Sequence, residues 1–155
     1  MEYEACSFLA EVPMRSIREF IDTDIPPTNT FPGRLPTAHT YKTNLMAALN
    51  ALLAKGIQPL ANDYIIDIRS SVGRGPHYMH GVLPCLTRSR GSAGHWLTWK
   101  QRFMNLHEVL LLMGVPPHRV MGVVLEATLG RIAGNAIPVP LVQRVIANLM
   151  HAAGL

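Results

Sequence analysis

The amino-acid sequence predicts a mixed fold that is mainly α-helical and has few strands. The chain has 155 residues, of which 48% are hydrophobic, so it is long enough and apolar enough to form a folded core. Several segments repeat their apolar residues at helical spacing, whereas one segment alone has the composition of a good strand. Aromatic residues make up 6% of the chain, so the core must rest on aliphatic side chains and methionine.

The N-terminal part predicts a short helix followed by a long connection. In residues 14–22 the apolar side chains fall three and four positions apart, on one face of a helix. These side chains are Ile17, Phe20 and Ile21. Residues 23–40 hold four prolines and one glycine, a composition that is typical of irregular structure. Long ordered connections of this kind often belong to binding surfaces.

Residues 41–56 predict an amphipathic helix, and residues 62–71 predict the best strand of the chain. The leucines on the expected inner face of the helix are Leu45, Leu49, Leu52 and Leu53. Gly56 follows as a suitable C-terminal cap. The strand has turn-forming residues at both ends, and its apolar and aromatic residues are Tyr64, Ile65, Ile66 and Ile68.

The segment after this strand offers little further sheet. Residues 72–81 are rich in glycine and predict a loop, while residues 82–87 predict a second short strand with Pro84 at a sheet edge. The middle third of the chain therefore has no obvious sheet for its strand to join. We take this as an indication that part of the fold is missing from this chain.

The C-terminal third predicts three helical pieces. Residues 105–117 open with a possible asparagine cap and close with a glycine and two prolines, which suits a short helix. Residues 118–133 are expected to be mostly helical and to be interrupted by the Gly-Asn-Ala that follows. Pro138 and Pro140 suit the start of the last helix. Its apolar side consists of Leu141, Val145, Ile146 and Leu149.

Positive charge is concentrated in the middle of the chain. The formal net charge is +4, and the stretch from residue 70 to residue 105 contains no Asp or Glu. Its basic residues are Arg74, Arg88, Arg90, Lys100 and Arg102, and Arg69 directly precedes it. A segment of one sign, interleaved with glycines and hydroxyls, indicates a surface that faces phosphates. A solvated basic face without a ligand is an equally good interpretation at this point.

The chain carries no signal for secretion or for a membrane. Its two cysteines, Cys6 and Cys85, do not make a disulfide framework. The N-terminus is acidic and lacks the long apolar core of a signal peptide, and the longest apolar runs are far shorter than a membrane span. We therefore expect an intracellular protein with no membrane partner.

The histidines and Cys85 are candidates for zinc binding or for nucleophilic catalysis. The spacing His-x2-His-x4-Cys-x9-His uses ligand types that zinc accepts, although it matches no familiar zinc finger. Its members are His77, His80, Cys85 and His95. Cys85 also has two arginines nearby that would lower the pKa of a nucleophilic thiol, but nothing in the sequence fixes a base beside it. Histidines in loops are the alternative to both.

Two longer patterns near the C-terminus are more specific. Residues 102–117, RFMNLHEVLLLMGVPP, have the pattern Arg-x-Met-x-x-x-Glu-x-Leu-x-Leu-Met-Gly-x-Pro, and residues 131–150 place Gly-Asn-Ala-Ile-Pro-Val-Pro before an apolar helix. They resemble the ninth and tenth conserved blocks of the DNA cytosine-5 methyltransferases, in the family's order and spacing. PCLTRSRG, residues 84–91, resembles the end of that family's target-recognition region. The resemblance covers residues 63–155, and residues 1–62 by position alone.

The resemblance implies roles for five residues. The family places a threonine against the DNA backbone where this chain has Thr87, whose hydroxyl suits a phosphate oxygen; a plain strand residue is the alternative. Arg88 and Arg90 beside it are candidates for phosphate or base contacts, with solvated charge as the alternative. In the tenth block the asparagine and the residue two positions later line the S-adenosylmethionine pocket, so the pattern assigns Asn135 and Ile137 to that pocket. Asn135 would also serve as a helix cap.

Other residues of the matching blocks are expected to be structural. The attacking cysteine of the family belongs to a Pro-Cys-Gln loop far ahead of the recognition region, so Cys85 stands in the wrong block and we interpret it as a small buried apolar residue. Arg102 and Glu108 are expected to brace the recognition region rather than to touch a substrate. The apolar residues of the ninth block, expected in the core, are Leu106, Leu110, Leu111 and Met113.

The family motifs that the chain lacks define what it is expected to be. It contains no Phe-x-Gly-x-Gly cofactor loop, no Pro-Cys-Gln, no Glu-Asn-Val and no Gln-x-Arg-x-Arg. The resemblance thus implies the C-terminal fragment of an α/β methyltransferase, whose terminal helices pack on a missing Rossmann-like sheet. Residues 1–62 would belong to the recognition region, residues 63–104 would be its basic target-recognition segment, and residues 105–155 would carry the last two blocks.

The function that follows is methyl transfer to cytosine C5 in DNA, with no catalytic residue in this chain. The fragment would supply DNA contacts and part of the S-adenosylmethionine pocket, with DNA and possibly a separate catalytic chain as partners, in a nucleus or nucleoid. Alone it should be inactive. The alternative is a non-catalytic basic helical module that binds nucleic acid.

Overall fold

A computed structural model describes residues 16–21, 38–70, 72–91 and 94–154. About half of these residues are helical, and four strands form one small antiparallel sheet, so the fold is mixed with few strands, as the sequence predicts. The helices are α1 (Arg18–Ile21), α2 (His39–Ala54), α3 (Leu106–Leu112), α4 (Glu126–Asn135) and α5 (Val139–Ala152). Short 3-10 helices cover Pro59–Ala61, Val72–Arg74 and Pro117–Arg119. Most of the proline-rich connection expected at 23–40, and Cys6, lie outside the described residues.

The sheet has the strand order β2-β1-β3-β4. Its strands are β1 (Tyr64–Asp67), β2 (Tyr78–His80), β3 (His95–Leu97) and β4 (Arg102–Phe103). β1 is the strand that the sequence predicts, and it pairs Ile65 with Met79 on one side and with Leu97 on the other. The expectation that β1 finds no sheet within this chain is therefore wrong. Its partners β2 and β3 are each three residues long and both contain a histidine and no β-branched residue, so neither alternation nor composition reveals them.

Two predictions for the segment after β1 are also wrong. Residues 72–81 were expected to form a loop, but residues 78–80 form β2, because they meet the edge of β1 in antiparallel register. Residues 82–87 were expected to form a strand and instead run without ladder partners. Pro84 has no N–H to donate, and the chain turns soon afterwards, where the amide of Arg90 donates to the carbonyl oxygen of Thr87 over 2.8 Å.

The predicted helices on either side of the sheet are present. In α2, Leu45 and Leu52 are fully buried, and Gly56 follows with φ +74°, as the capping pattern predicts. Leu53 was expected on the inner face but is 49% exposed, since it lies one position, or about 100° of rotation, beyond Leu52. The short helix at the N-terminus also forms, with Ile21 buried.

The helix of the ninth block begins and ends as its sequence predicts. The side chain of Asn105 accepts a hydrogen bond from the amide of Glu108 over 2.9 Å, and the carboxylate of Glu108 accepts one from the amide of Asn105 over 2.9 Å. This reciprocal capping box fixes the start of α3. Gly114 follows the helix with φ +72°, a backbone conformation that glycine adopts without strain.

The helical expectation for residues 118–133 is half right. The stretch between Arg119 and α4 consists of turns, and α4 continues through Gly134 to Asn135, so Gly-Asn-Ala does not interrupt it at Gly134. The break comes at Ala136, which has extended backbone, and Pro138 disfavours helical backbone at Ile137 and precedes the next helix as its N-cap.

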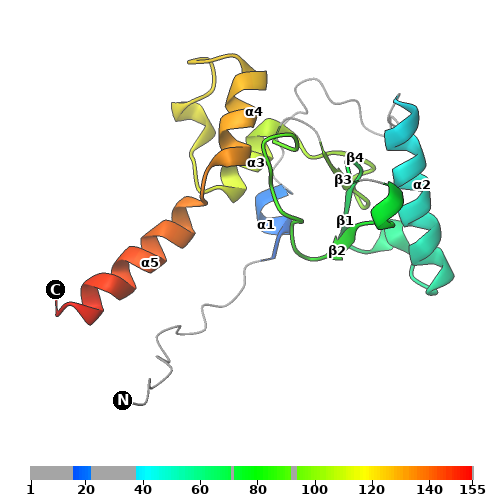
Figure 1. The fold of residues 1–155 in the computed structure, drawn as a ribbon, viewed down its shortest axis with the longest axis horizontal. Coiled ribbons are helices and arrows are strands. Elements are labelled where there is room, and N and C mark those ends of the chain that lie inside the picture. The colour runs from blue at the N-terminus through cyan, green and yellow to red at the C-terminus, as the bar shows by residue number, and fades with distance from the viewer. Residues whose placement is uncertain (1–15, 22–37, 71, 92–93, 155) are drawn as a thin grey trace.

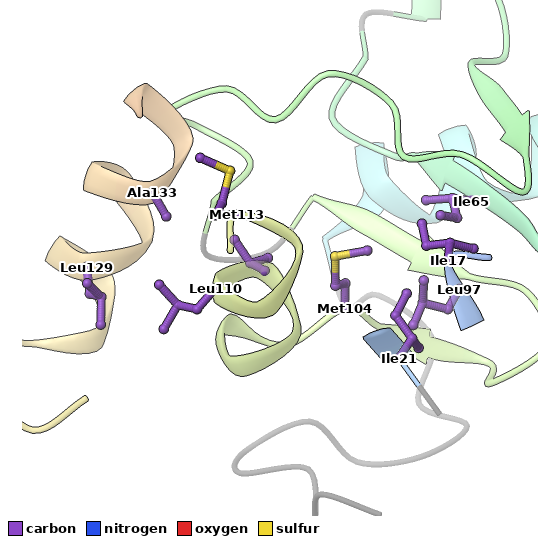
Figure 2. Packing of buried hydrophobic residues seen from close by; sticks show 10 residues of the cluster. Ile17, Ile21, Ile65, Leu97, Met104, Leu110, Met113, Leu129 and Ala133 are labelled. Carbon is purple, nitrogen blue, oxygen red and sulfur yellow. The ribbon is translucent and has the colours of Figure 1, made fainter. Parts of the chain in front are cut away.

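Two clusters of buried side chains hold the described part together. The larger one lies between α1, the sheet, α3 and α4, and Figure 2 shows Leu110 of α3 and Met113, which directly follows α3, facing Leu129 and Ala133 of α4. The smaller cluster joins α2 to the other face of the sheet through Leu45, Ala48, Ile66, Ile68 and Trp96. α5 contributes no buried residue and extends away from the rest of the fold (Figure 1). Among the described residues, the helices are too short or too polar to cross a membrane.

Candidate nucleic-acid interface

The segment that carries Thr87 forms a tight turn at the surface. The amides of Arg90 and Gly91 both donate to the carbonyl oxygen of Thr87, over 2.8 and 3.1 Å. These two bonds close residues 87–91 into a compact unit, which we call the TRSRG turn. Within it, Arg88 and Ser89 are exposed, and the hydroxyls of Thr87 and Ser89 lie 3.2 Å apart. The turn thus presents two hydroxyls and one arginine together at the surface.

Arg90 anchors this turn to the sheet. Its Nε donates to Oδ2 of Asp67, the last residue of β1, over 2.7 Å, and its Nη1 donates to the hydroxyl oxygen of Thr87 over 2.9 Å. Asp67 is buried, so this charge-assisted bond is shielded from water. The structure therefore separates the two arginines that the sequence treats alike. Arg88 is exposed, whereas two nitrogens of Arg90 donate hydrogen bonds to Asp67 and Thr87 and so fix the position of the Thr87 hydroxyl.

The TRSRG turn also packs directly on the backbone of α4. A Cβ added to Gly91 would overlap with the carbonyl oxygen of Gly130, and one added to Gly134 would overlap with the carbonyl oxygen of Thr87. Gly130 and Gly134 are one helical turn apart and buried, so they form a strip without side chains against which the turn lies. This contact joins the two regions for which the family resemblance implies DNA contacts and cofactor contacts.

An open pocket of about 420 Å³ lies beside the turn. It is lined by Arg69, Thr87, Arg88, Ser89 and Arg131. Sequence reasoning placed Thr87 and Arg88 here, noted Arg69 only as a neighbour of the basic segment, and missed Arg131 on α4 altogether. The available signal for Arg131 was its position directly after Gly130, in a helix whose Gly-x-x-x-Gly spacing allows a close backbone approach.

A second pocket, of about 350 Å³, contains Cys85. Its lining comprises Asp67, Ser70, Arg74, His77, Cys85, Thr87 and Arg90. Cys85 is exposed, so its interpretation as a small buried residue is wrong. Neighbours in extended backbone point to opposite sides, and Pro84 takes the inward position.

The four residues of the zinc spacing all belong to the described part of the chain, and they do not gather at one site. The imidazole Nε2 of His80 lies 3.2 Å from Oδ1 of Asp63, and His95 is buried in β3 on the other side of β1. His77 lies 3.9 Å from Asp67 at the second pocket. Within the described residues, no three His, Cys, Asp or Glu side chains come together in a way that would hold a metal ion.

Burial makes His95 a neutral side chain at ordinary pH. It is 1% exposed, and loss of hydration lowers its pKa from 6.5 to about 4. The negative charge of Asp67 opposes this shift, while the charges of Arg90 and His77 add to it. His95 is thus an uncharged neighbour of the Asp67–Arg90 pair that holds the TRSRG turn, since it pairs with Asp67 across β1 and β3.

The two residues assigned to the cofactor pocket lie at the junction of α4 and α5. Asn135 is the last residue of α4 and is exposed, and Ile137 is 64% exposed in the connection. The beginning of α5 is fixed by a hydrogen bond from the amide of Val139 to the carbonyl oxygen of Met113, over 2.9 Å. Beyond this point its apolar face is uncovered in the described structure. The exposed members are Leu141, Val142, Val145, Ile146, Leu149 and Met150.

Arg102 and Glu108 form the brace expected of them. The guanidinium of Arg102 donates to both carboxylate oxygens of Glu108, over 2.9 and 2.6 Å, and both side chains are buried. Because Glu108 also accepts the amide of Asn105, one carboxylate ties β4 to the start of α3. The pair is remote from the lining of both pockets.

Comparison with known proteins adds nothing to this geometry. No family model matches the chain, and neither a curated protein nor a solved structure matches it significantly. The functional argument therefore rests on the residues and their arrangement.

Proposed function

We propose that the chain is the C-terminal segment of a DNA cytosine-5 methyltransferase, in which it contributes DNA contacts and one wall of the S-adenosylmethionine pocket. One observation carries the proposal. The TRSRG turn and α4 are in backbone contact through Gly91, Gly130 and Gly134, so Thr87 and Asn135 belong to one unit. An enzyme that must hold DNA and a methyl donor in fixed relation needs such a connection.

The DNA side of the proposal is supported by the chemistry at the turn. The hydroxyl of Thr87 accepts from Arg90, so its own proton is available for Ser89 or for a phosphate oxygen. Arg88 stands exposed beside it and adds a positive charge. Such contacts position a duplex without reading its sequence. Methylation of a flipped cytosine requires this kind of grip on the distorted backbone.

The cofactor side of the proposal is supported by the exposed residues at the junction of α4 and α5. Asn135 offers a donor and an acceptor at the surface, and Ile137 offers an apolar contact, which together suit a ligand with polar and apolar parts. S-adenosylmethionine supplies the electrophilic methyl group, and this chain's residues would orient it. The apolar face of α5 continues from the same junction. An amphipathic helix with no buried residue is typical of a segment that docks on a further part of the protein.

The chemical step itself belongs to residues outside this chain. The family's reaction needs a cysteine thiolate that attacks C6 of the cytosine, and the motif that carries it is absent here. Cys85 is exposed, but it lies in a pocket with the Asp67–Arg90 anchor and not at the Asn135 junction. The segment would therefore act by positioning DNA and cofactor, which is where most of the rate of a two-substrate reaction is gained.

A chimaera tests the proposal. The recognition region and last two blocks of an active cytosine-5 methyltransferase are replaced by this chain, and transfer of labelled methyl groups to DNA is measured. We expect methylation by the chimaera and none by the isolated chain. The L149D variant should abolish methylation by preventing docking of α5, while leaving the isolated chain as stable as before because Leu149 is 64% exposed. Turnover by the isolated chain would contradict the proposed division of labour.

A second candidate function is a non-catalytic module that binds nucleic acid. The observation that favours it is the complete four-stranded sheet with its own core, which lets the described part stand without another domain. The two candidates differ in their requirement for the Asn135 junction. An N135A variant should bind DNA normally under both, but it should lower methylation by the chimaera only if the first is correct.

A further inference from the structure

We infer that Arg69, Arg88 and Arg131 hold one backbone phosphate of a nucleic acid in the pocket beside Thr87, with Arg131 acting from α4 as the opposing side of a clamp. The identification of that nucleic acid as duplex DNA rests on the proposed function, whereas the phosphate chemistry does not. The three arginines come from three segments, namely the end of β1, the TRSRG turn and α4. The pocket is therefore assembled by the fold and not by one basic run.

The charge of the pocket is uncompensated. Among the described residues, three guanidinium groups and two hydroxyls line it, and no carboxylate does. Within the part of the chain that the structure describes, the ion pairs involve other residues, and none includes Arg69, Arg88 or Arg131. Like charges that converge on one space repel one another, and an anion with several acceptor oxygens relieves that repulsion.

Arg69 is held in place before any ligand arrives. Its Nη1 donates to the carbonyl oxygen of Ser89, and its guanidinium carbon lies 5.4 Å from the centre of the Tyr41 ring. Its Nε is buried and has no hydrogen-bond partner among the described residues. An arginine that is stacked and bonded on one edge loses little freedom on binding.

The glycine contact explains why Arg131 can take part. Gly130, the residue before it, lies against Gly91, so the backbone of α4 reaches the TRSRG turn without intervening side chains. Arg131 is exposed and lines the same pocket as Thr87 and Ser89 of the turn. A phosphate between them would accept from hydroxyls on one side and from a guanidinium on the other.

Fluorescence anisotropy with a short fluorescein-labelled DNA duplex tests the inference on the full chain. The variants are R131Q, R131K and, as a matched control, R119Q, which removes an exposed arginine that does not line the pocket. We expect R131Q to bind about tenfold more weakly than the wild type. The slope of log Kd against log salt should fall by about one. R131K should fall between the two, because it keeps the charge but not the fork.

Equal affinity and salt slope for R131Q and R119Q would overturn the inference. A labelled RNA duplex is the second arm: Arg131-dependent binding of RNA but not of DNA keeps the pocket and removes the methyltransferase proposal. If the chimaera is inactive but the isolated chain binds DNA through Arg131, the pocket is likewise kept and the methyltransferase proposal is removed. If the chimaera methylates DNA and the R131Q variant binds DNA as well as the wild type, the arginine clamp is contradicted while the proposed function stands.

Discussion

His95 shows at the scale of a single residue how burial determines behaviour. In the unfolded chain its pKa is about 6.5, and in the folded protein it is lowered to about 4, mainly because the charged form loses its hydration. Between these two values the unfolded state binds more protons than the folded state. The free energy of unfolding therefore decreases as the pH falls from 6.5 to 4, by as much as about 3 kcal/mol.

Urea unfolding at a series of pH values measures this effect. We expect the H95Q variant, which cannot be protonated there, to lose the corresponding part of the pH dependence over the same range. Comparison with the wild type removes the contributions of the other histidines. An identical pH profile in the two proteins would show that His95 is hydrated in the folded state.

The Arg102–Glu108 pair supports a second prediction about single residues. Replacing Glu108 by Gln leaves the buried guanidinium without its carboxylate, and we expect a loss of about 3–5 kcal/mol in the free energy of unfolding. The control is E126Q at an exposed position of α4, which should change stability by less than about 0.5 kcal/mol. Chemical denaturation of both variants suffices, and similar midpoints would show that the pair is not a brace.

At the scale of elements, the contact between the TRSRG turn and α4 is the feature on which the proposed function depends. A methyl group at Gly134 would overlap with the backbone of Thr87 and Arg88, which cannot move aside as a flexible side chain would. We expect G134A to destabilise the protein by about 1–3 kcal/mol, although alanine is the better helix former. The A127S variant also adds one atom to α4, at an exposed position, and should be nearly neutral.

Hydrogen exchange shows where this damage falls. In G134A the amides of Arg90 and Gly91, which bond to the carbonyl oxygen of Thr87, should lose protection, while the amides of α2 should keep theirs. A G134A protein as stable as the wild type, with an unchanged turn, would mean that the two elements are not in backbone contact.

The elements also show what the sequence could and could not predict. Capping residues and apolar spacing predicted α2, α3 and the start of α5, because these signals are local. The partners of β1 escaped prediction because three-residue strands are defined by register with a distant segment and not by their own composition. Arg131 and the anchoring role of Arg90 escaped for a similar reason: the pairing of Arg90 with Asp67 spans 23 positions.

At the scale of the whole molecule, the described residues form a packed body, and one helix, α5, takes no part in its buried core. The sheet, α1, α2, α3 and α4 share two buried clusters, whereas α5 leaves the body at Val139 with its apolar face open (Figure 1). Thr87 and Arg88 line the arginine pocket, and the backbone of the same two residues contacts Gly134, the residue before Asn135. We interpret this arrangement as one wall of a larger enzyme, shaped for DNA and for a methyl donor.

The most direct measurement is an NMR titration of the ¹⁵N-labelled chain with S-adenosylmethionine, because chemical shifts report weak binding to an incomplete site residue by residue. The account predicts saturable changes centred on the amides of Asn135, Ala136 and Ile137, and their loss in the N135A variant. Absence of changes at these amides, or identical changes in N135A, would contradict the claim that this junction forms part of a methyl-donor pocket.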